Sequence, residues 1–256
     1  MKLDKKTQLY SSLKWVYQPI KASQSLIRDI SYIPRRNRLL QRFANADFVG
    51  LQIGCGPFYL KGWINTDLPP NSCMDFSLDI THPLPLPSNY FHVIYGAEVI
   101  EHITLSESRY FLSEALRVLC PGGVIRLTTP DLINTCRIYL HQHTKANPEN
   151  FGTVWLDGEF SDEIWINSIF RSWGHQFLYS FEMIRQEMQS IGFSNITRVE
   201  PQVTKSRFPQ LNNLEVRYGA NPREWIFENT LIIEASKPET EVLKTGNKEQ
   251  EPIRLG

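Results

Sequence analysis

The sequence predicts an α/β fold built on a mostly parallel sheet. From its first apolar run onward, short apolar segments alternate with segments of helical periodicity, which is typical of successive βαβ units. That first run, residues 48–53, stops at Gly54-Cys55-Gly56, where two glycines allow a sharp turn without Cβ atoms in the way of a ligand. The second apolar segment ends at Asp67. Loops of this kind meet at the carboxyl edge of a parallel sheet, where open α/β folds bind nucleotides.

Composition excludes several classes of function. The chain has 256 residues, with 27 basic and 27 acidic side chains, so its net charge does not favour nucleic acid or an anionic membrane. Its apolar runs are far shorter than the roughly 18 residues of a membrane span. The N-terminus lacks the apolar stretch of a secretory signal, and we expect a cytoplasmic protein.

The sequence predicts no bound metal. The cysteines lack the paired spacing of zinc sites, and no residue near His141 and His143 completes a ligand set. The cysteines are Cys55, Cys73, Cys120 and Cys136.

We expect three parts along the chain. Residues 1–45 carry apolar side chains at helical spacing and form an N-terminal helical extension. Residues 46–236 form the main domain, and within it the aromatic-rich segment 132–179 interrupts the alternation and covers the carboxyl edge as a substrate lid. Residues 237–256 are polar and aperiodic, which predicts a disordered tail.

The glycine turn is not a dinucleotide fingerprint. Tyr59 occupies the position of its third glycine, and the acidic residue Asp67 follows sooner than the fingerprint requires. A carboxylate at that point can accept both hydroxyls of a ribose, which favours an adenosyl ligand without a pyrophosphate. A tight turn that binds no ligand is the alternative.

The first half of the domain follows from spacing and proline content. Between Gly56 and Asp67 there is little room for a crossover helix, so we expect only a turn or two around residues 58–62. The prolines of residues 83–87 predict a stiff loop. Residues 91–97 are apolar and predict a central strand.

The helix that follows has a clear start. Thr104 and Glu107 form a capping box, and residues 120–123 are expected to end the helix and turn into a strand over 124–129. Its expected core face consists of Tyr110, Phe111, Leu112, Ala115, Leu116 and Leu119.

The last elements complete the sheet. Ser180 is expected to cap a helix that runs through Ile191 and stops at Gly192. Residues 195–200 and 230–235 then predict two late strands, which we expect to pair antiparallel.

In this order the motifs resemble those of class I S-adenosylmethionine-dependent methyltransferases. The resemblance spans about residues 47–132, with a looser continuation to 236, and it implies a Rossmann-like fold with a mostly parallel seven-stranded sheet, a late antiparallel strand pair and helices on both faces. Residues 62–67 and 170–179 resemble, more narrowly, a bacterial subgroup of methyltransferases of type 11. His92 departs from the aspartate that is common in relatives. The motifs are Leu51–Pro57, Asp67, Asp79-Ile80, Phe91–His102 and Leu119–Gly123.

The resemblance implies S-adenosylmethionine as the cofactor. It assigns the ribose hydroxyls to Asp67 and the adenine amino group to Asp79, while the two glycines of the turn let backbone amides approach the methionine carboxylate. Gly96 and Ala97 would leave a flat space for the purine. The implied cofactor-binding residues are Gly54, Cys55, Gly56, Asp67, Leu68, Asp79, Ile80, Gly96, Ala97 and Glu98.

Three residues are candidates for catalysis. His175 follows the small Gly174 in a loop expected to face the cofactor, and an imidazole titrates near neutral pH, so it is the first candidate to deprotonate an acceptor. Glu101 and His102 follow the fourth strand of the family pattern, close to the methyl group. The structural alternatives are a loop-anchoring histidine for His175, and helix capping or packing for the other two.

The acceptor is predicted by exclusion. The Asn-Pro-Pro-Tyr type of signature that marks base-amino methyltransferases is absent, because Gly96-Ala97-Glu98-Val99 stands at its position. We therefore expect direct in-line methyl transfer to oxygen or nitrogen of a small-molecule or sugar-like, glycan-type acceptor, and no nucleic acid. A catalytically silent binding or scaffold protein is one alternative. Aminopropyl transfer is another, with a polyamine held by Asp157, Glu159, Asp162 and Glu163.

Overall fold

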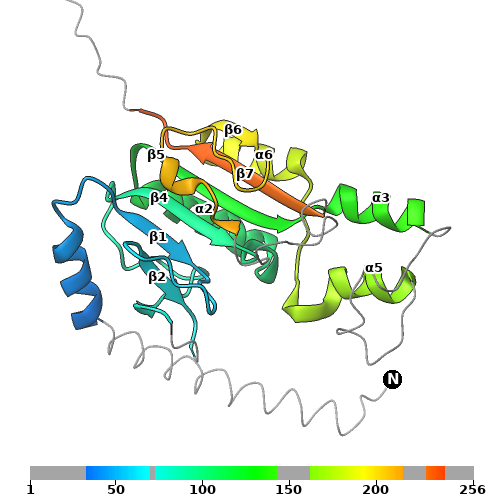
Figure 1. Ribbon diagram of the computed structural model, residues 1–256, viewed down its shortest axis with the longest axis horizontal. Coiled ribbons are helices and arrows are strands. Elements are labelled where there is room, and N and C mark those ends of the chain that lie inside the picture. Colours follow the sequence, from blue (N-terminus) through cyan, green and yellow to red (C-terminus); the bar gives the residue numbers. More distant parts are fainter. Residues whose placement is uncertain (1–32, 70–72, 143–161, 216–228, 240–256) are drawn as a thin grey trace, which may run out of the picture.

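A computed structural model describes residues 33–69, 73–142, 162–215 and 229–239. Seven strands form one sheet in the order β3-β2-β1-β4-β5-β7-β6 (Figure 1). Residues 1–32 and the tail from 240 lie outside the described part, and so do the expectations for them. The strands are β1 (Gly50–Ile53), β2 (Ile64–Asp67), β3 (Phe76–Ser77), β4 (Phe91–Ala97), β5 (Leu119–Pro130), β6 (Ser194–Arg198) and β7 (Thr230–Ser236).

The pairing confirms the predicted topology. β1 lies parallel to β2 and β4, β2 parallel to β3, and β4 parallel to β5. β7 runs antiparallel to both of its neighbours, β5 and β6, which is the late antiparallel pair. The order along the chain reverses direction between β1 and β4, and ligands of open α/β sheets bind outside the carboxyl ends of strands at such a switch point.

The two long helices on the sheet begin and end at the predicted caps. α2 (Leu105–Val118) opens with the capping box of Thr104 and Glu107, in which the backbone amide of each residue donates to the side chain of the other. α6 (Phe181–Ile191) starts at Ser180, whose hydroxyl accepts from a backbone amide, and ends at Gly192 with φ of 113°. These local signals are strong because each satisfies an end group that the helix itself leaves unbonded.

The sheet separates two apolar layers. α2 and α6 cover one face, where β1, β4 and β5 contribute a continuous buried cluster. On the other face, the short 3-10 helix η4 (Pro209–Leu211) and its flanking residues pack over a smaller cluster around Trp63 and Tyr95. Because the central strands are buried on both faces, they read in the sequence as continuous apolar runs.

Two details of the predicted helix and strand were wrong. β5 begins at Leu119 rather than Val124, because the glycine pair forms a bulge where the register to β4 shifts and Gly122 takes φ of 71°. Tyr110 is 41% exposed. The buried face of α2 carries Ser108, Phe111 and Leu112, and position 110 lies on a different side of the helix.

The insertion has a small core of its own. α3 (Leu132–Gln142) continues from the end of β5 away from the sheet, and α5 (Asp162–Arg171) lies beside it (Figure 1). The 3-10 helix η3 (Ser172–Gly174) then leads the chain back. Trp165, Ile169 and Leu178 form the buried centre of this cluster. Most of the aromatic side chains expected in the lid lie at 143–161, outside the described residues, or pack here.

At the N-terminal side, residues 33–43 are helical. Leu39, Leu40 and Phe43 pack against the main core, and Arg35 lies 3.8 Å from the carboxylate of Asp75. Within the described part of the chain, no helix has the length and apolar character needed to cross a membrane.

Candidate active site

A cavity of about 350 Å³ lies at the carboxyl ends of β1, β2 and β4. It is built by the glycine turn after β1, the carboxylate that ends β2, the segment after β3, and the residues that follow β4. This is the position that the switch point of the sheet predicts. Its lining consists of Gly54, Gly56, Asp67, Leu68, Leu78, Asp79, Ile80, Thr81, Glu98, Val99, His102 and Ile103.

Both glycines of the turn adopt backbone conformations that favour glycine. Gly54 has φ of 58° and Gly56 has φ of 54°. A Cβ on Gly54 would lie 2.4 Å from Cγ2 of Val99, whereas a Cβ on Gly56 would meet nothing within 4 Å. Gly54 is therefore required by close packing and by conformation, and Gly56 by conformation alone.

Asp67 is fixed at the cavity wall by backbone amides. Its Oδ2 accepts from the amide of Gly56 at 2.7 Å, and its Oδ1 accepts from the amide of Leu68 at 2.6 Å. One carboxylate therefore ties the end of β2 to the glycine turn after β1. Charge-assisted bonds of this kind hold their geometry more strongly than neutral ones.

Asp79 lines the same cavity from the opposite segment. Its Oδ1 accepts from the amide and the hydroxyl of Thr81 at 2.9 and 2.7 Å, and its Oδ2 lies 3.3 Å from Nδ1 of His82. Partial burial works against ionisation of this carboxyl, but the bonds from Thr81 and the charge of His82 outweigh it. The pKa of Asp79 consequently lies below its ordinary value, and the group is a carboxylate at neutral pH.

Three of the residues expected at the cofactor do not line this cavity. Cys55 is buried, and burial raises the pKa of its thiol to about 11. Gly96 lies inside the sheet, where a Cβ would meet side-chain atoms of Ile53 and Leu127 at 2.7 and 3.1 Å, and Ala97 belongs to the second apolar cluster. Neighbouring side chains thus fill the side of Gly96 on which a Cβ would lie, and the cofactor contacts expected of Gly96 and Ala97 stay predictions.

The residues after β4 form the other end of the cavity. Glu98 has φ of 54°, an uncommon conformation for a residue with a side chain, and its carboxylate accepts from the hydroxyl of Thr128 at 3.1 Å. Glu98 and His102 line the cavity, while Glu101 lies behind them and is completely buried. Strained backbone of this kind is found mainly where surrounding contacts impose it, and often at functional sites.

Glu101 is a buried carboxyl group beside another carboxylate. Its Oε2 accepts from the hydroxyl of Thr129 at 3.0 Å, and its Oε1 has no hydrogen-bond partner among the described residues. Burial first, and the charge of Glu98 second, raise the pKa of Glu101 well above its ordinary value. Nε2 of His102 lies 3.9 Å from that Oε1.

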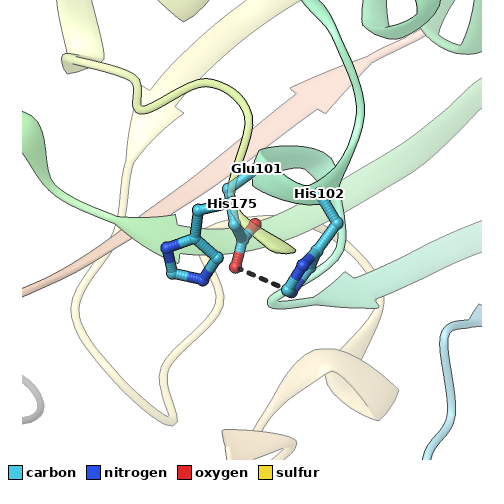
Figure 2. Close-up of side chains that lie close together, drawn as sticks. All are labelled: Glu101, His102 and His175. Carbon is cyan, nitrogen blue, oxygen red and sulfur yellow. Dashed lines mark ion pairs between the residues drawn. The ribbon is translucent and has the colours of Figure 1, made fainter. Parts of the chain in front are cut away.

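His175 reaches this group from the insertion. Figure 2 shows the carboxylate of Glu101 between the imidazoles of His102 and His175, whose ring centroids are 4.9 Å apart. Nδ1 of His175 lies 2.6 Å from the carbonyl oxygen of Ile169. A carbonyl only accepts, so Nδ1 carries the proton, and in the neutral ring Nε2 then holds a lone pair. Nδ1 of His175 thus anchors the loop, and the catalytic role of the other nitrogen stays a prediction.

Backbone contacts hold the two segments together. The carbonyl oxygen of Glu101 accepts from the amides of Gln176 and Phe177 at 2.7 and 3.2 Å, and Nε2 of Gln176 donates to the carbonyl of His102 at 2.8 Å. Trp173 turns the chain with φ of 57° and lies beside His175. The sequence identified the three catalytic candidates one by one, but only these contacts bring them together.

Several residues of the alternative polyamine site and of the rejected histidine metal site lie outside the described part of the chain. Asp157, Glu159 and His143 lie outside the described residues. Glu163 is exposed near the start of α5, away from the lining of the cavity.

Comparison with known proteins agrees with the site. Residues 64–127 match the family model described as a methyltransferase domain. Over 60 residues the chain is 43% identical to a curated protein of Mycolicibacterium smegmatis (strain ATCC 700084 / mc(2)155), described as a "Probable S-adenosylmethionine-dependent methyltransferase/". That match covers 22% of this chain and 23% of the relative, so it spans about a quarter of the relative's length.

Solved structures with a similar fold include two methyltransferases. The phosphoethanolamine N-methyltransferase 2 of Haemonchus contortus, in complex with phosphomonomethylethanolamine and S-adenosylhomocysteine, is 14% identical with a TM-score of 0.45, over 81% of this chain and 53% of that chain. A methyltransferase of Archaeoglobus fulgidus is 15% identical with a TM-score of 0.43, over 82% of this chain and 94% of that one. The family match and the curated relative confirm the predicted resemblance to methyltransferases.

Proposed function

We propose that this chain, which carries a class I S-adenosylmethionine-dependent methyltransferase domain, transfers the methyl group to oxygen or nitrogen of a small-molecule or sugar-like acceptor. We assign the domain to residues 46–236, with 132–179 covering the acceptor. The equal numbers of basic and acidic residues, 27 each, support an acceptor other than nucleic acid. A cytoplasmic enzyme is part of the same proposal.

One observation carries this function: Gly56, Asp67 and Asp79 line a single cavity. In the proposed complex Asp67 accepts from the ribose hydroxyls and Asp79 accepts from the adenine amino group. Both roles need an ionised acceptor, and the lowered pKa of Asp79 supports that state at neutral pH. The glycine turn leaves room for the methionine end of the cofactor.

The acceptor is proposed to lie toward Glu98 and His102, which line the far end of the same cavity. Its lone pair attacks the methyl carbon in line with the carbon–sulfur bond, and the electrons of that bond pass to sulfur, which leaves S-adenosylhomocysteine. Nε2 of His175 takes the proton that the acceptor loses. Alignment of donor and acceptor can supply up to roughly 7–11 kcal/mol of the barrier reduction.

Isothermal titration of the full chain with S-adenosylmethionine tests the cofactor site. In the proposed complex, Asp67→Ala removes the two charge-assisted bonds to the ribose, each worth about 1.5–3 kcal/mol, so the dissociation constant should rise by at least about 100-fold. Glu182→Gln, at an exposed position of α6, is the matched control and should bind as the wild type does. Absence of binding by the wild type, or equal binding by Asp67→Ala, would refute the proposal.

Transfer of a tritiated methyl group into a lysate of the native organism tests turnover and acceptor class. Label in a small metabolite or a glycan is the expected result, and label in nucleic acid would contradict the acceptor class. Cofactor binding without any transfer would favour the silent binding or scaffold protein instead.

A further inference from the structure

We propose that Glu101, His102 and His175 form a binding site for a divalent transition-metal ion at the acceptor end of the cavity. Each residue offers one ligand atom, and the three atoms lie within 4.8 Å of one another. Two imidazoles and one carboxylate are a ligand set suited to Zn²⁺, Mn²⁺ or Co²⁺.

Side-chain movement is needed to close this cluster on an ion. In a tetrahedral site, metal–ligand bonds of about 2.1 Å place two ligand atoms about 3.4 Å apart. The three ligand atoms lie within 4.8 Å of one another, so the side chains have to draw together by up to about 1.4 Å. Figure 2 shows the carboxylate and both rings converging on the same space, with Glu101 and His102 from η1 (Ile100–His102) and His175 from the loop after η3.

His175 already has the hydrogen bond typical of a metal-bound histidine. Such a ring usually donates its second nitrogen to a carbonyl or carboxylate, which fixes the tautomer and aims the other nitrogen at the metal. Nδ1 of His175 donates to the carbonyl of Ile169 at 2.6 Å, and this leaves Nε2 for the ion. Ile169 lies in the last turn of α5, so the insertion supplies both this ligand and the carbonyl that orients it.

The buried carboxyl group of Glu101 gives a second indication. Glu101 is 0% exposed, and its Oε1 meets no hydrogen-bond donor among the described residues. This oxygen lies 3.9 Å from Nε2 of His102, and Glu98 places a second carboxyl group nearby. A divalent cation would satisfy the oxygen and supply a countercharge to both carboxyl groups.

The ion would also have a role in the reaction. Since His102 and Glu98 line the cofactor cavity, a metal held here can bind the hydroxyl of an acceptor and lower its pKa. Nε2 of His175 can take the acceptor's proton only in the metal-free protein; when it binds the ion, the hydroxyl proton leaves to solvent instead. This role rests on the proposed methyl transfer, but the binding site itself does not.

Metal binding can be measured without cofactor or acceptor. The full chain is treated with EDTA, dialysed, and titrated with Zn²⁺ by calorimetry and with Co²⁺ by visible absorption. We expect one equivalent of either ion and a Co²⁺ spectrum of low coordination number. Even partners outside the ligand set change metal affinity by about 10- to 100-fold, so Glu101→Gln and His175→Gln should each weaken binding by at least about 100-fold.

His82→Gln is the matched control, because this ring is exposed and lies outside the cluster, so its Zn²⁺ affinity should equal that of the wild type. Circular dichroism establishes that each variant is folded. The site is refuted if the wild type binds no stoichiometric ion, if both ligand variants bind as the wild type does, or if His82→Gln abolishes binding. Because S-adenosylmethionine is absent throughout, these outcomes are separate from failure of the proposed methyl transfer.

Discussion

Two ionisable groups are completely buried on or near β5, and they differ in their partners. Arg126 donates to Glu234 through Nη1 at 2.7 Å and to Glu215 through Nε at 2.9 Å. Glu101 is equally buried, but its partners are the carboxyl group of Glu98 and the imidazole of His102, whose Nε2 lies 3.9 Å from Oε1. The first cluster holds a permanent cation between two carboxylates. The second pairs two carboxyl groups, and it opens onto the cofactor cavity through Glu98 and His102.

The difference separates a structural charge from a functional one. Taking an ion out of water costs several kcal/mol, which a structure recovers only with well-placed partners. The Arg126 cluster has such partners on β7 and on the segment after η4, and it joins them to the sheet. The only ion-pair partner of Glu101 among the described residues is His102, and buried groups with strongly shifted pKa values are concentrated at binding and catalytic sites. The contrast leads to predictions for stability.

The largest expected effect is that of Arg126→Met. It removes the shared cation and leaves Glu215 and Glu234 buried together, so we expect a loss of about 3–5 kcal/mol in the free energy of unfolding. Urea denaturation followed by circular dichroism measures it.

The matched variant replaces all three members, Arg126→Met with Glu215→Leu and Glu234→Leu. Exchange of a whole buried ion cluster for apolar residues is often neutral or stabilising, so most of the stability should return. A loss of unfolding free energy below about 1 kcal/mol for Arg126→Met alone would show that the buried cation does not stabilise the fold.

An intermediate effect is expected at Tyr179, an uncharged polar group near Glu101. Its hydroxyl donates to Ser108 at 2.8 Å, and burial raises the pKa of this tyrosine to about 12. Tyr179→Phe removes the bond and should cost about 1 kcal/mol of unfolding free energy at neutral pH.

The pH dependence of this difference has a definite sign. The folded protein holds the proton of Tyr179 more tightly than the unfolded chain does, because the folded pKa is raised from 10.0 to about 12. The advantage of the wild type over Tyr179→Phe is therefore complete below pH 10 and declines as the pH rises from 10 toward 12. Urea denaturation of both proteins at several pH values measures it, and a difference that grows with pH would contradict the assignment.

Most of the sheet and the cofactor end of the site could be predicted because their signals are local. Asp67 and the glycine turn each stand directly after an apolar run, and in a parallel sheet such ends meet at one edge. The caps Thr104 and Ser180 satisfy amides within their own first turns. None of these inferences requires knowledge of which distant segments touch.

The parts that could not be predicted depend on distant contacts. Gly96 lacks a side chain, which suggested a platform for a ligand, but side-chain atoms of Ile53 and Leu127 fill the space where its Cβ would lie, and no local pattern reveals that. The countercharges of Arg126 likewise come from distant segments. His175 and Glu101 are both recognisable candidates, yet their meeting depends on how the insertion returns to η1 through backbone bonds, so their combination as one ligand set came only from the structure.

The smallest effect on stability is expected at Glu101→Gln in metal-free protein. A glutamine has the shape of the protonated acid, accepts from the hydroxyl of Thr129 through its oxygen and donates to Glu98 through its amide, so the unfolding free energy should change by less than about 1 kcal/mol. Urea denaturation of EDTA-treated protein measures this change beside that of Arg126→Met. A loss as large as that of Arg126→Met would mean that Glu101 is a structural charge after all. A small loss, together with lost affinity for Zn²⁺, is the behaviour of a group that is held in place for a ligand.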